Sequence, residues 1–304
     1  MGWLAYLLLG EAENEHGEGD RVQIIKDSIC QTWEWSNHPT ALAGIILVMK
    51  EITAEVWHPA RPTTVLQPGQ VHVWRASLIT TPDEVSLAWR VLSAAEQARA
   101  DRFRFELHRG RFVRAHAIMR GILAFYTATV PAQLQFRVTA TGKPYLAGAA
   151  EAPRFNLSHS EDLMVLAVCQ GGDVGVDVEV HSAAMVWRDI AESYFTLTEI
   201  EAIENGASEP ARLERFYRAW TLKEAYLKAQ GAGLAGNLDQ VEIDLSDETG
   251  ARFSRLPGAE HEKHRWQAFC FQPASGASGA LVTEYGLRRE LVRFSVENLA
   301  EVSV

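Results

Sequence analysis

The sequence is poor in cysteine: its 304 residues contain three, Cys30, Cys169 and Cys270. These lie far apart in the chain, and no Cys-x-x-Cys pair occurs. An odd number of widely spaced cysteines argues against a disulfide framework and a zinc knuckle, and is typical of a reducing compartment. We therefore expect a cytoplasmic protein.

Long hydrophobic runs and an excess of basic residues are also missing. The longest apolar runs, Trp3–Leu9 and Ala41–Met49, are too short to span a bilayer. Trp3–Leu9 follows no basic residue and precedes an acidic stretch, which argues against a signal peptide. Lys and Arg number 29 against 39 Asp and Glu, a net charge of −10. We expect neither membrane insertion nor nucleic-acid binding.

The first 70 residues differ from the rest of the chain. They hold four basic and nine acidic residues, and Pro59, Pro62 and Pro68 interrupt their last part. We interpret residues 1–70 as an N-terminal extension that ends in an irregular, proline-rich linker. Regular structure is expected from Val71 onward, and no internal repeat is evident.

After residue 70 the order mixes blocks of strand pattern with blocks of helix pattern, which predicts an α+β fold and not a doubly wound sheet. Thr81 and Ser93 each begin a capping-box pattern that predicts a helix start. The predicted strands are 71–76, 155–157, 164–169, 174–180, 241–245 and 266–271; the predicted longer helices are 112–126 and 210–230, the second ended by Gly231.

Basic residues are concentrated between positions 99 and 120. Seven arginines lie in this stretch: Arg99, Arg102, Arg104, Arg109, Arg111, Arg114 and Arg120. They form either an anion-binding surface or an ordinary solvated helix face.

The stretch Gly175–Val180 (GVDVEV) combines a strand pattern with two carboxylates. Successive side chains of a strand alternate between its faces, so Asp177 and Glu179 share one face and the valines take the other. Two such carboxylates can bind Mg²⁺ together with substrate phosphates. The alternative is a half-exposed strand whose polar residues face water.

Two further segments carry reactive groups. Helix 210–230 places Trp220, Glu224 and Lys228 on one face, where Glu224 and Lys228 form either a surface pair or part of a site with the two strand carboxylates. Three converging carboxylates would need a cation. His159 lies between two serines at the end of a predicted strand, a suitable place to bind phosphate. No Gly-x-Ser-x-Gly elbow is present, which argues against a hydrolase triad.

Four motifs in order resemble the 4′-phosphopantetheinyl transferase superfamily, of the surfactin-synthetase-activating type. They are GKPYL (142–146), FNLSHS (155–160), GVDVEV (175–180) and FYRAWTLKEAYLKAQGAGL (216–234). The resemblance runs from Val71 to the last residue. It implies a monomer with two similar α+β halves, 71–170 and 171–304, related by a pseudo-twofold axis. It also implies that coenzyme A and Mg²⁺ bind between the halves.

The resemblance further implies an enzyme that moves phosphopantetheine from coenzyme A to a serine of an apo acyl or peptidyl carrier protein, releasing 3′,5′-ADP. The implied Mg²⁺ ligands are Asp177, Glu179 and Glu224. The implied contacts to the coenzyme A phosphates are Lys143, Ser158 and His159, with His159 at the 3′-phosphate, and the implied basic contacts to the nucleotide end are Arg99 and Arg111. Glu96 departs from the family, some members of which have lysine there. Trp220 would shape the cleft.

Phosphoryl transfer to a serine requires a base and a group that stabilises the leaving phosphate. We assign the base to Glu224, acting directly or through a metal-bound water, and the second role to Lys228. A non-catalytic module that binds the carrier or coenzyme A is the alternative function. A magnesium-dependent phosphohydrolase that transfers phosphopantetheine to water is a third.

Overall fold

The computed structural model describes residues 55–61, 64–148, 152–231, 238–246, 251–258, 261–284 and 289–302. Most of the expected N-terminal extension therefore lies outside the described residues. From Trp57 onward, the described residues belong to one compact unit. No helix within these ranges combines the length and the apolar character that crossing a membrane requires.

The end of the expected linker is part of this unit, which differs from the prediction. The short strand β1 (His58–Pro59) pairs in parallel with β12 (Glu290–Val296). Trp57 packs edge-on against Phe271. The guanidinium carbon of Arg75 lies 4.5 Å from the centroid of the Trp57 ring. Proline is tolerated here because β1 is an edge strand and needs fewer backbone hydrogen bonds. A boundary at residue 70 thus cuts through packed structure.

The first half of the unit begins with a strand, continues with three helices, and ends with a small hairpin and an antiparallel strand pair. Its elements are β2 (Gln70–Ser77), α4 (Pro82–Trp89), α5 (Ala94–Ala100), α6 (Glu106–Thr127), β3 (Phe136–Val138), β4 (Pro144–Leu146), β5 (Arg154–Ser160) and β6 (Leu163–Cys169). The capping boxes predicted at Thr81 and Ser93 are confirmed.

The second half repeats this order, which confirms the expectation of two similar α+β halves. Its elements are β7 (Val174–Val180), α7 (Trp187–Tyr194), α8 (Leu197–Glu204), α9 (Glu209–Gln230), β8 (Glu242–Asp244), β9 (Arg252–Arg255), the short α10 (Glu262–Arg265), β10 (Trp266–Phe271) and β11 (Ala277–Glu284). Both α6 and α9 have 22 residues. The predicted stop of α9 is confirmed, since Gly231 has a left-handed φ of 66°.

A buried ion pair recurs at the same place in both halves. In the first, the Arg120 guanidinium contacts Glu96 and donates to the carbonyls of Pro131 and Leu134. In the second, the Lys223 ammonium lies 2.8 Å from a Glu199 oxygen and donates to carbonyls that include Val241. Glutamate and cation are 24 residues apart in both pairs. The internal repeat that the sequence did not reveal is therefore present in the contacts.

Replacing Glu199 with alanine is expected to lower the free energy of unfolding by about 3–5 kcal/mol, because the fully buried Lys223 ammonium would lose its carboxylate. Urea denaturation measures the loss. Thr196→Ala is the control: it removes only the hydroxyl that accepts from the Glu199 N–H, which costs about 1 kcal/mol. Equal losses in the two variants would contradict the importance of the ion pair.

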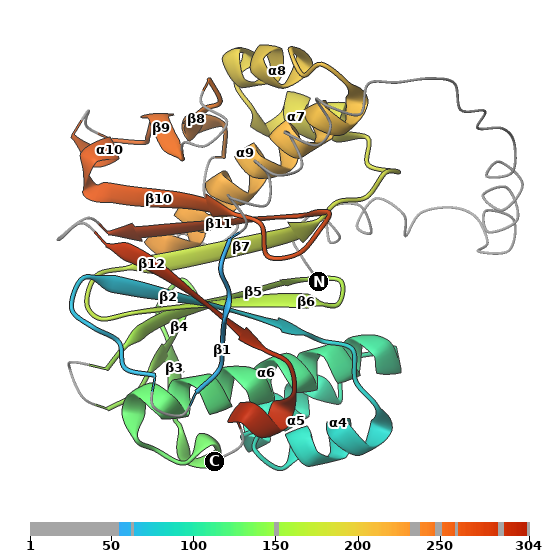
Figure 1. Ribbon diagram of the computed structural model, residues 1–304, viewed down its shortest axis with the longest axis vertical. Helices are drawn as coiled ribbons and strands as arrows, with labels where there is room; N and C mark the ends of the chain where they lie inside the picture. Colours follow the sequence, from blue (N-terminus) through green and yellow to red (C-terminus); the bar gives the residue numbers. More distant parts are fainter. Residues whose placement is uncertain are drawn as a thin grey trace, which may run out of the picture. The chain divides into compact units, whose positions relative to one another are not determined.

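Two sheets stack between two groups of helices (Figure 1). One sheet has the order β1-β12-β2-β6-β5 and the other the order β10-β11-β7. Trp74, Ile118 and Leu166 belong to a core between the first sheet and α6. Val73, Val165 and Val176 belong to a second core that contains residues of both sheets. The second face of β7 contacts α9. β5 and β7 each lie at the edge of their sheet, and they contact each other where the two halves meet.

The last strand does not stay with the second half. β12 lies between β1 and β2 in the first sheet and is parallel to both. The following 3₁₀ turn, Leu299–Val302, packs against α6, where Gly121 leaves room for the Val302 carbonyl. The predicted domain 171–304 therefore does not match the structure at its end, because residues 290–302 complete the first half.

Candidate active site

The GVDVEV strand has the two faces that its alternation predicted. Val176 and Val178 are buried in the core shared by the sheets. Gly175 lies on the opposite face, where an added Cβ would be 2.1 Å from the Ala225 carbonyl oxygen of α9. The absence of a side chain at Gly175 thus lets α9 approach the strand face that carries Asp177 and Glu179.

Helix α9 brings a lysine to this face. The Lys228 ammonium lies 2.5 Å from Asp177 Oδ1 and 2.9 Å from Ser158 Oγ, and Ser158 Oγ is itself 2.8 Å from Asp177 Oδ1. The predicted meeting of strand and helix is confirmed for this group. The Glu224–Lys228 surface pair does not occur among the ion pairs of the described residues, since Lys228 reaches across to Asp177 instead.

The three carboxylates are buried and influence one another. Burial, and to a smaller extent the neighbouring charge of Asp177, raise the pKa of Glu179 to about 8. Burial also raises the pKa of Glu224 to about 7, with the Lys228 charge opposing the shift and the Asp177 charge reinforcing it. Ionisation of all three carboxyl groups near neutral pH would therefore require positive charge in addition to that of Lys228.

The donor set fits a hard cation that also takes ligands from a substrate. Across the described ranges, no group of three or more His, Cys, Asp or Glu side chains is arranged to hold a metal ion by itself. However, Asp177 Oδ2 and Glu179 Oε1 are both buried without a hydrogen-bond partner. Buried carboxylate oxygens are normally satisfied, and Mg²⁺ commonly binds one or two carboxylates together with substrate phosphates.

Strand β5 places its polar side chains as the sequence predicted. Asn156 and Ser158 both reach β7: Asn156 Oδ1 accepts from the Val176 N–H, and Ser158 contacts Asp177. His159 belongs to the other face of β5, the face on which Phe155 packs into the α6 core. Burial, together with smaller contributions from the positive charges of neighbours such as Lys228 and Arg111, lowers the pKa of His159 to about 3. His159 is therefore a neutral ring in a basic environment.

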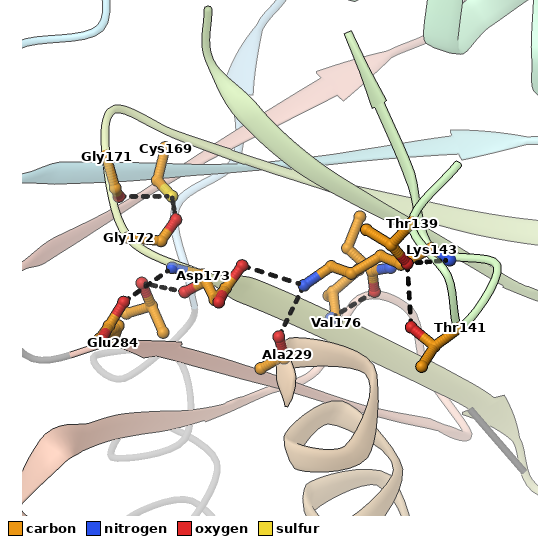
Figure 2. A network of polar contacts seen from close by, with 12 residues as sticks. Thr139, Thr141, Lys143, Cys169, Gly171, Gly172, Asp173, Val176, Ala229 and Glu284 are labelled. Atoms are coloured by element: carbon orange, nitrogen blue, oxygen red, sulfur yellow. Dashed lines mark hydrogen bonds and ion pairs between the residues drawn. The ribbon is translucent and has the colours of Figure 1, made fainter. Parts of the chain in front are cut away.

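Lys143 lies at the end of α9 (Figure 2). Its ammonium donates to the Ala229 carbonyl at 2.6 Å and is 3.6 Å from Asp173 Oδ1. A cation at a helix C-terminus is favourable because the last carbonyls lack partners within the helix. The structure thus does not bring Lys143 into contact with Ser158 or His159, the residues with which it was expected to bind phosphate.

The two arginines expected at the nucleotide end have protein partners. Arg111 Nε lies 2.8 Å from Asp162 Oδ1, and another of its nitrogens is 3.1 Å from Glu161. The guanidinium carbon of Arg99 is 5.3 Å from the centroid of the Phe112 ring. Glu96 pairs with Arg120 and is part of the buried ion pair of the first half.

Trp220, which was expected to shape the cleft, has no exposed surface. Its indole ring packs against Phe216 of the same helix and against Tyr194 and Phe195 at the end of α7. Ser160, by contrast, was not assigned a role. Its hydroxyl contacts Glu179 Oε2 at 2.7 Å. The sequence contained a signal for this contact: Ser158 and Ser160 are two residues apart, as are Asp177 and Glu179, so side chains on facing strands can pair in one register.

Family models match both halves of the chain. Residues 74–171 match the model described as 4′-phosphopantetheinyl transferase, N-terminal, and residues 173–282 match that of the 4′-phosphopantetheinyl transferase superfamily. The 4′-phosphopantetheinyl transferase HetI of Nostoc sp. is 36% identical over 203 residues, 66% of this chain and 85% of that protein.

Other relatives are similar to shorter shares of the chain. A putative 4′-phosphopantetheinyl transferase of Synechocystis sp. is 33% identical over 57% of this chain and 70% of its own length. The human L-aminoadipate-semialdehyde dehydrogenase-phosphopantetheinyl transferase is 32% identical over 53% of this chain and 55% of its own length. Among solved structures, the holo-[acyl-carrier-protein] synthase of Thermotoga maritima aligns with a TM-score of 0.30 and 22% identity over 37% of this chain and 62% of that one.

Proposed function

Since the chain belongs to the 4′-phosphopantetheinyl transferase superfamily, we propose that it transfers phosphopantetheine from coenzyme A to a serine of an apo acyl or peptidyl carrier protein, with release of 3′,5′-ADP. The observation that carries the proposal is the contact of Lys228 with Asp177 and Ser158, because it joins three motifs of the chain at one point. One chain supplies both β5 and β7, so we propose that the protein acts as a monomer. We also propose that it acts in the cytoplasm, as its few, widely spaced cysteines predict.

Coenzyme A would bind along the basic side of this site. His159 is neutral and can donate a hydrogen bond to the 3′-phosphate, while Lys228 and Arg111 supply positive charge nearby. Ser158 would contact the pyrophosphate. We also assign Lys143 to the coenzyme A phosphates, which requires Lys143 to exchange the Ala229 carbonyl for a phosphate oxygen, and Arg99 to the nucleotide end.

Asp177 and Glu179, with Glu224, would hold Mg²⁺, which fits the unpartnered oxygens of the first two. When bound, Mg²⁺ would neutralise charge on the pyrophosphate. Glu224 would accept the proton of the carrier serine as its oxygen attacks phosphorus. Lys228 would donate a charge-assisted hydrogen bond to the departing phosphate, for which its side chain keeps some exposure.

Intact-protein mass spectrometry tests the proposed function. The protein is incubated with Mg²⁺, coenzyme A and a panel of apo carriers, and the modified carriers are expected to gain the mass of phosphopantetheine. A carrier whose acceptor serine is replaced by alanine is the control and should gain nothing. No gain on any carrier would contradict the transferase and favour a binding module. Free phosphopantetheine without carrier would indicate a phosphohydrolase.

Replacing His159 with alanine is expected to raise the KM for coenzyme A about tenfold, because one buried hydrogen bond to phosphate would be lost. The KM for 3′-dephospho-coenzyme A should change little, since that substrate lacks the proposed partner. Steady-state kinetics with both substrates measure the difference. Equal losses would remove His159 from the 3′-phosphate.

A further inference from the structure

Three alternate side chains of β5 connect the edges of the two sheets. Asn156, Ser158 and Ser160 all reach β7, where they contact the Val176 N–H, the Asp177 carboxylate and the Glu179 carboxylate. Each serine is separated from its carboxylate by 19 residues. The contacts therefore follow one register along two edge strands that form no backbone ladder with each other.

Each serine leaves one oxygen of its carboxylate without a partner. Ser158 contacts Asp177 Oδ1 and Ser160 contacts Glu179 Oε2, whereas Asp177 Oδ2 and Glu179 Oε1 are buried and unpartnered. These are the two oxygens that fit a cation. Each carboxylate is thus oriented so that one oxygen is hydrogen-bonded to a serine and the other oxygen can bind a cation.

Ser160 has the more constrained position of the two serines. Its oxygen accepts from the Val180 N–H at 3.1 Å, and a backbone N–H can only donate. The single hydroxyl proton of Ser160 is therefore directed to Glu179 Oε2. Ser158 differs, because its oxygen also contacts the Lys228 ammonium.

We propose that Ser160 is a positioning residue that holds the Glu179 carboxylate with Oε1 directed to the divalent cation. This inference rests on the proposed function, since it concerns the same site. Ser160 acts through Glu179 and touches neither substrate nor cation. Groups that orient a metal ligand in this way commonly contribute about 10–100-fold to metal affinity.

Binding of Mn²⁺, measured by electron paramagnetic resonance on the full chain with coenzyme A and without carrier, tests the inference. Mn²⁺ is used because it prefers the same oxygen ligands as Mg²⁺. Ser160→Ala is expected to weaken Mn²⁺ binding at least about tenfold. In a Glu179→Gln background, Ser160→Ala should cause little further loss, because the group that it orients is altered.

Asn156→Ala is the matched control. It removes another hydrogen bond between β5 and β7, in which the Asn156 side chain accepts from the Val176 N–H and no carboxylate takes part. It is expected to lower the melting temperature and to leave Mn²⁺ affinity within about twofold of the wild type. If Ser160→Ala does not fold, Ser160→Cys keeps a similar volume with a much weaker donor, and the same loss is expected.

Three results would overturn the inference: wild-type Mn²⁺ affinity in the Ser160 variant, an equal loss in Asn156→Ala, or an unchanged Ser160→Ala effect in the Glu179→Gln background. Failure of the proposed function is seen separately. A protein that modifies no carrier but loses Mn²⁺ affinity on Ser160→Ala retains the positioning residue and refutes only the transferase.

Discussion

Replacing Asp177 with asparagine is expected to lower kcat/KM for phosphopantetheine transfer by about 10³-fold, because stabilisation of the transition state by a bound metal is worth several kcal/mol. The amide keeps the shape of the side chain, and its oxygen can still accept from Ser158 and Lys228. The fold should therefore persist. Since 1 kcal/mol shifts the melting temperature of a protein of this size class by about 2–4 °C, we expect a change within about 4 °C.

Carrier modification followed by mass spectrometry, together with a thermal melt, measures both parts of this prediction. Asp101→Asn is the control: it makes the same chemical change at an exposed residue, paired with Arg109, that has no contact with the site. A variant at Asp177 with transfer near the wild-type rate would remove this carboxylate from the metal site. Loss of activity together with loss of the fold would mean that its role is structural.

Replacing Gly175 with alanine is expected to reduce both stability and transfer. The added Cβ would lie 2.1 Å from the Ala225 carbonyl oxygen and 2.3 Å from the Ala229 nitrogen, and backbone atoms can yield only if α9 moves. Overpacking of this kind costs about 1–3 kcal/mol. Because Glu224 and Lys228 are on α9, a displacement of about 1 Å would reduce transfer by about 10²-fold.

Gly110→Ala is the matched control, because it makes the same substitution where the nearest atoms belong to side chains, which can yield by a few tenths of an ångström, and not to backbone. A Cβ at Gly110 would meet only side-chain methyl groups, the nearest 3.3 Å away on Thr80. Alanine is favoured over glycine inside a helix, so this variant is expected to be as stable as the wild type or more stable by up to about 1 kcal/mol. Urea denaturation and the carrier assay compare the two. Wild-type behaviour of Gly175→Ala would show that the close approach of α9 is not required.

The local parts of the site were predictable because they depend on short-range periodicity. Alternation along β7 placed Asp177 and Glu179 on one face, and alternation along β5 separated Ser158 from His159. Both facts follow from the geometry of an extended strand. The end of α9 was equally predictable, because Gly231 can adopt the left-handed conformation that terminates a helix.

The partners of these side chains were less predictable, because they depend on distances between elements. Lys228 was expected to pair with Glu224 along its own helix or to join the site, and the close approach at Gly175 brings it to Asp177. Lys143 was expected near phosphate, yet the turn that carries it packs against the end of α9. Neither result follows from the spacing within one element.

The repeated halves escaped sequence analysis for a different reason. Glu96 pairs with Arg120, while Glu199 pairs with Lys223, so the two halves use different cations at the same place. Arginine and lysine satisfy the neighbouring carbonyls with different numbers of donors. The two halves thus share a hydrogen-bonding pattern and not residue identity, and a comparison of their amino-acid sequences does not detect it.

The position of β12 between β1 and β2 has a consequence for the order of events during synthesis. β2 and β12 are about 220 residues apart in the chain, and Gln70 Nε2 contacts Glu290 across that interval. While the ribosome is still making the intervening chain, β2 has an unpaired edge that could pair with other molecules. The first half therefore cannot complete its sheet until translation passes residue 296, and contacts of such long range slow folding. Nascent chains stalled before that point are expected to require protection from aggregation.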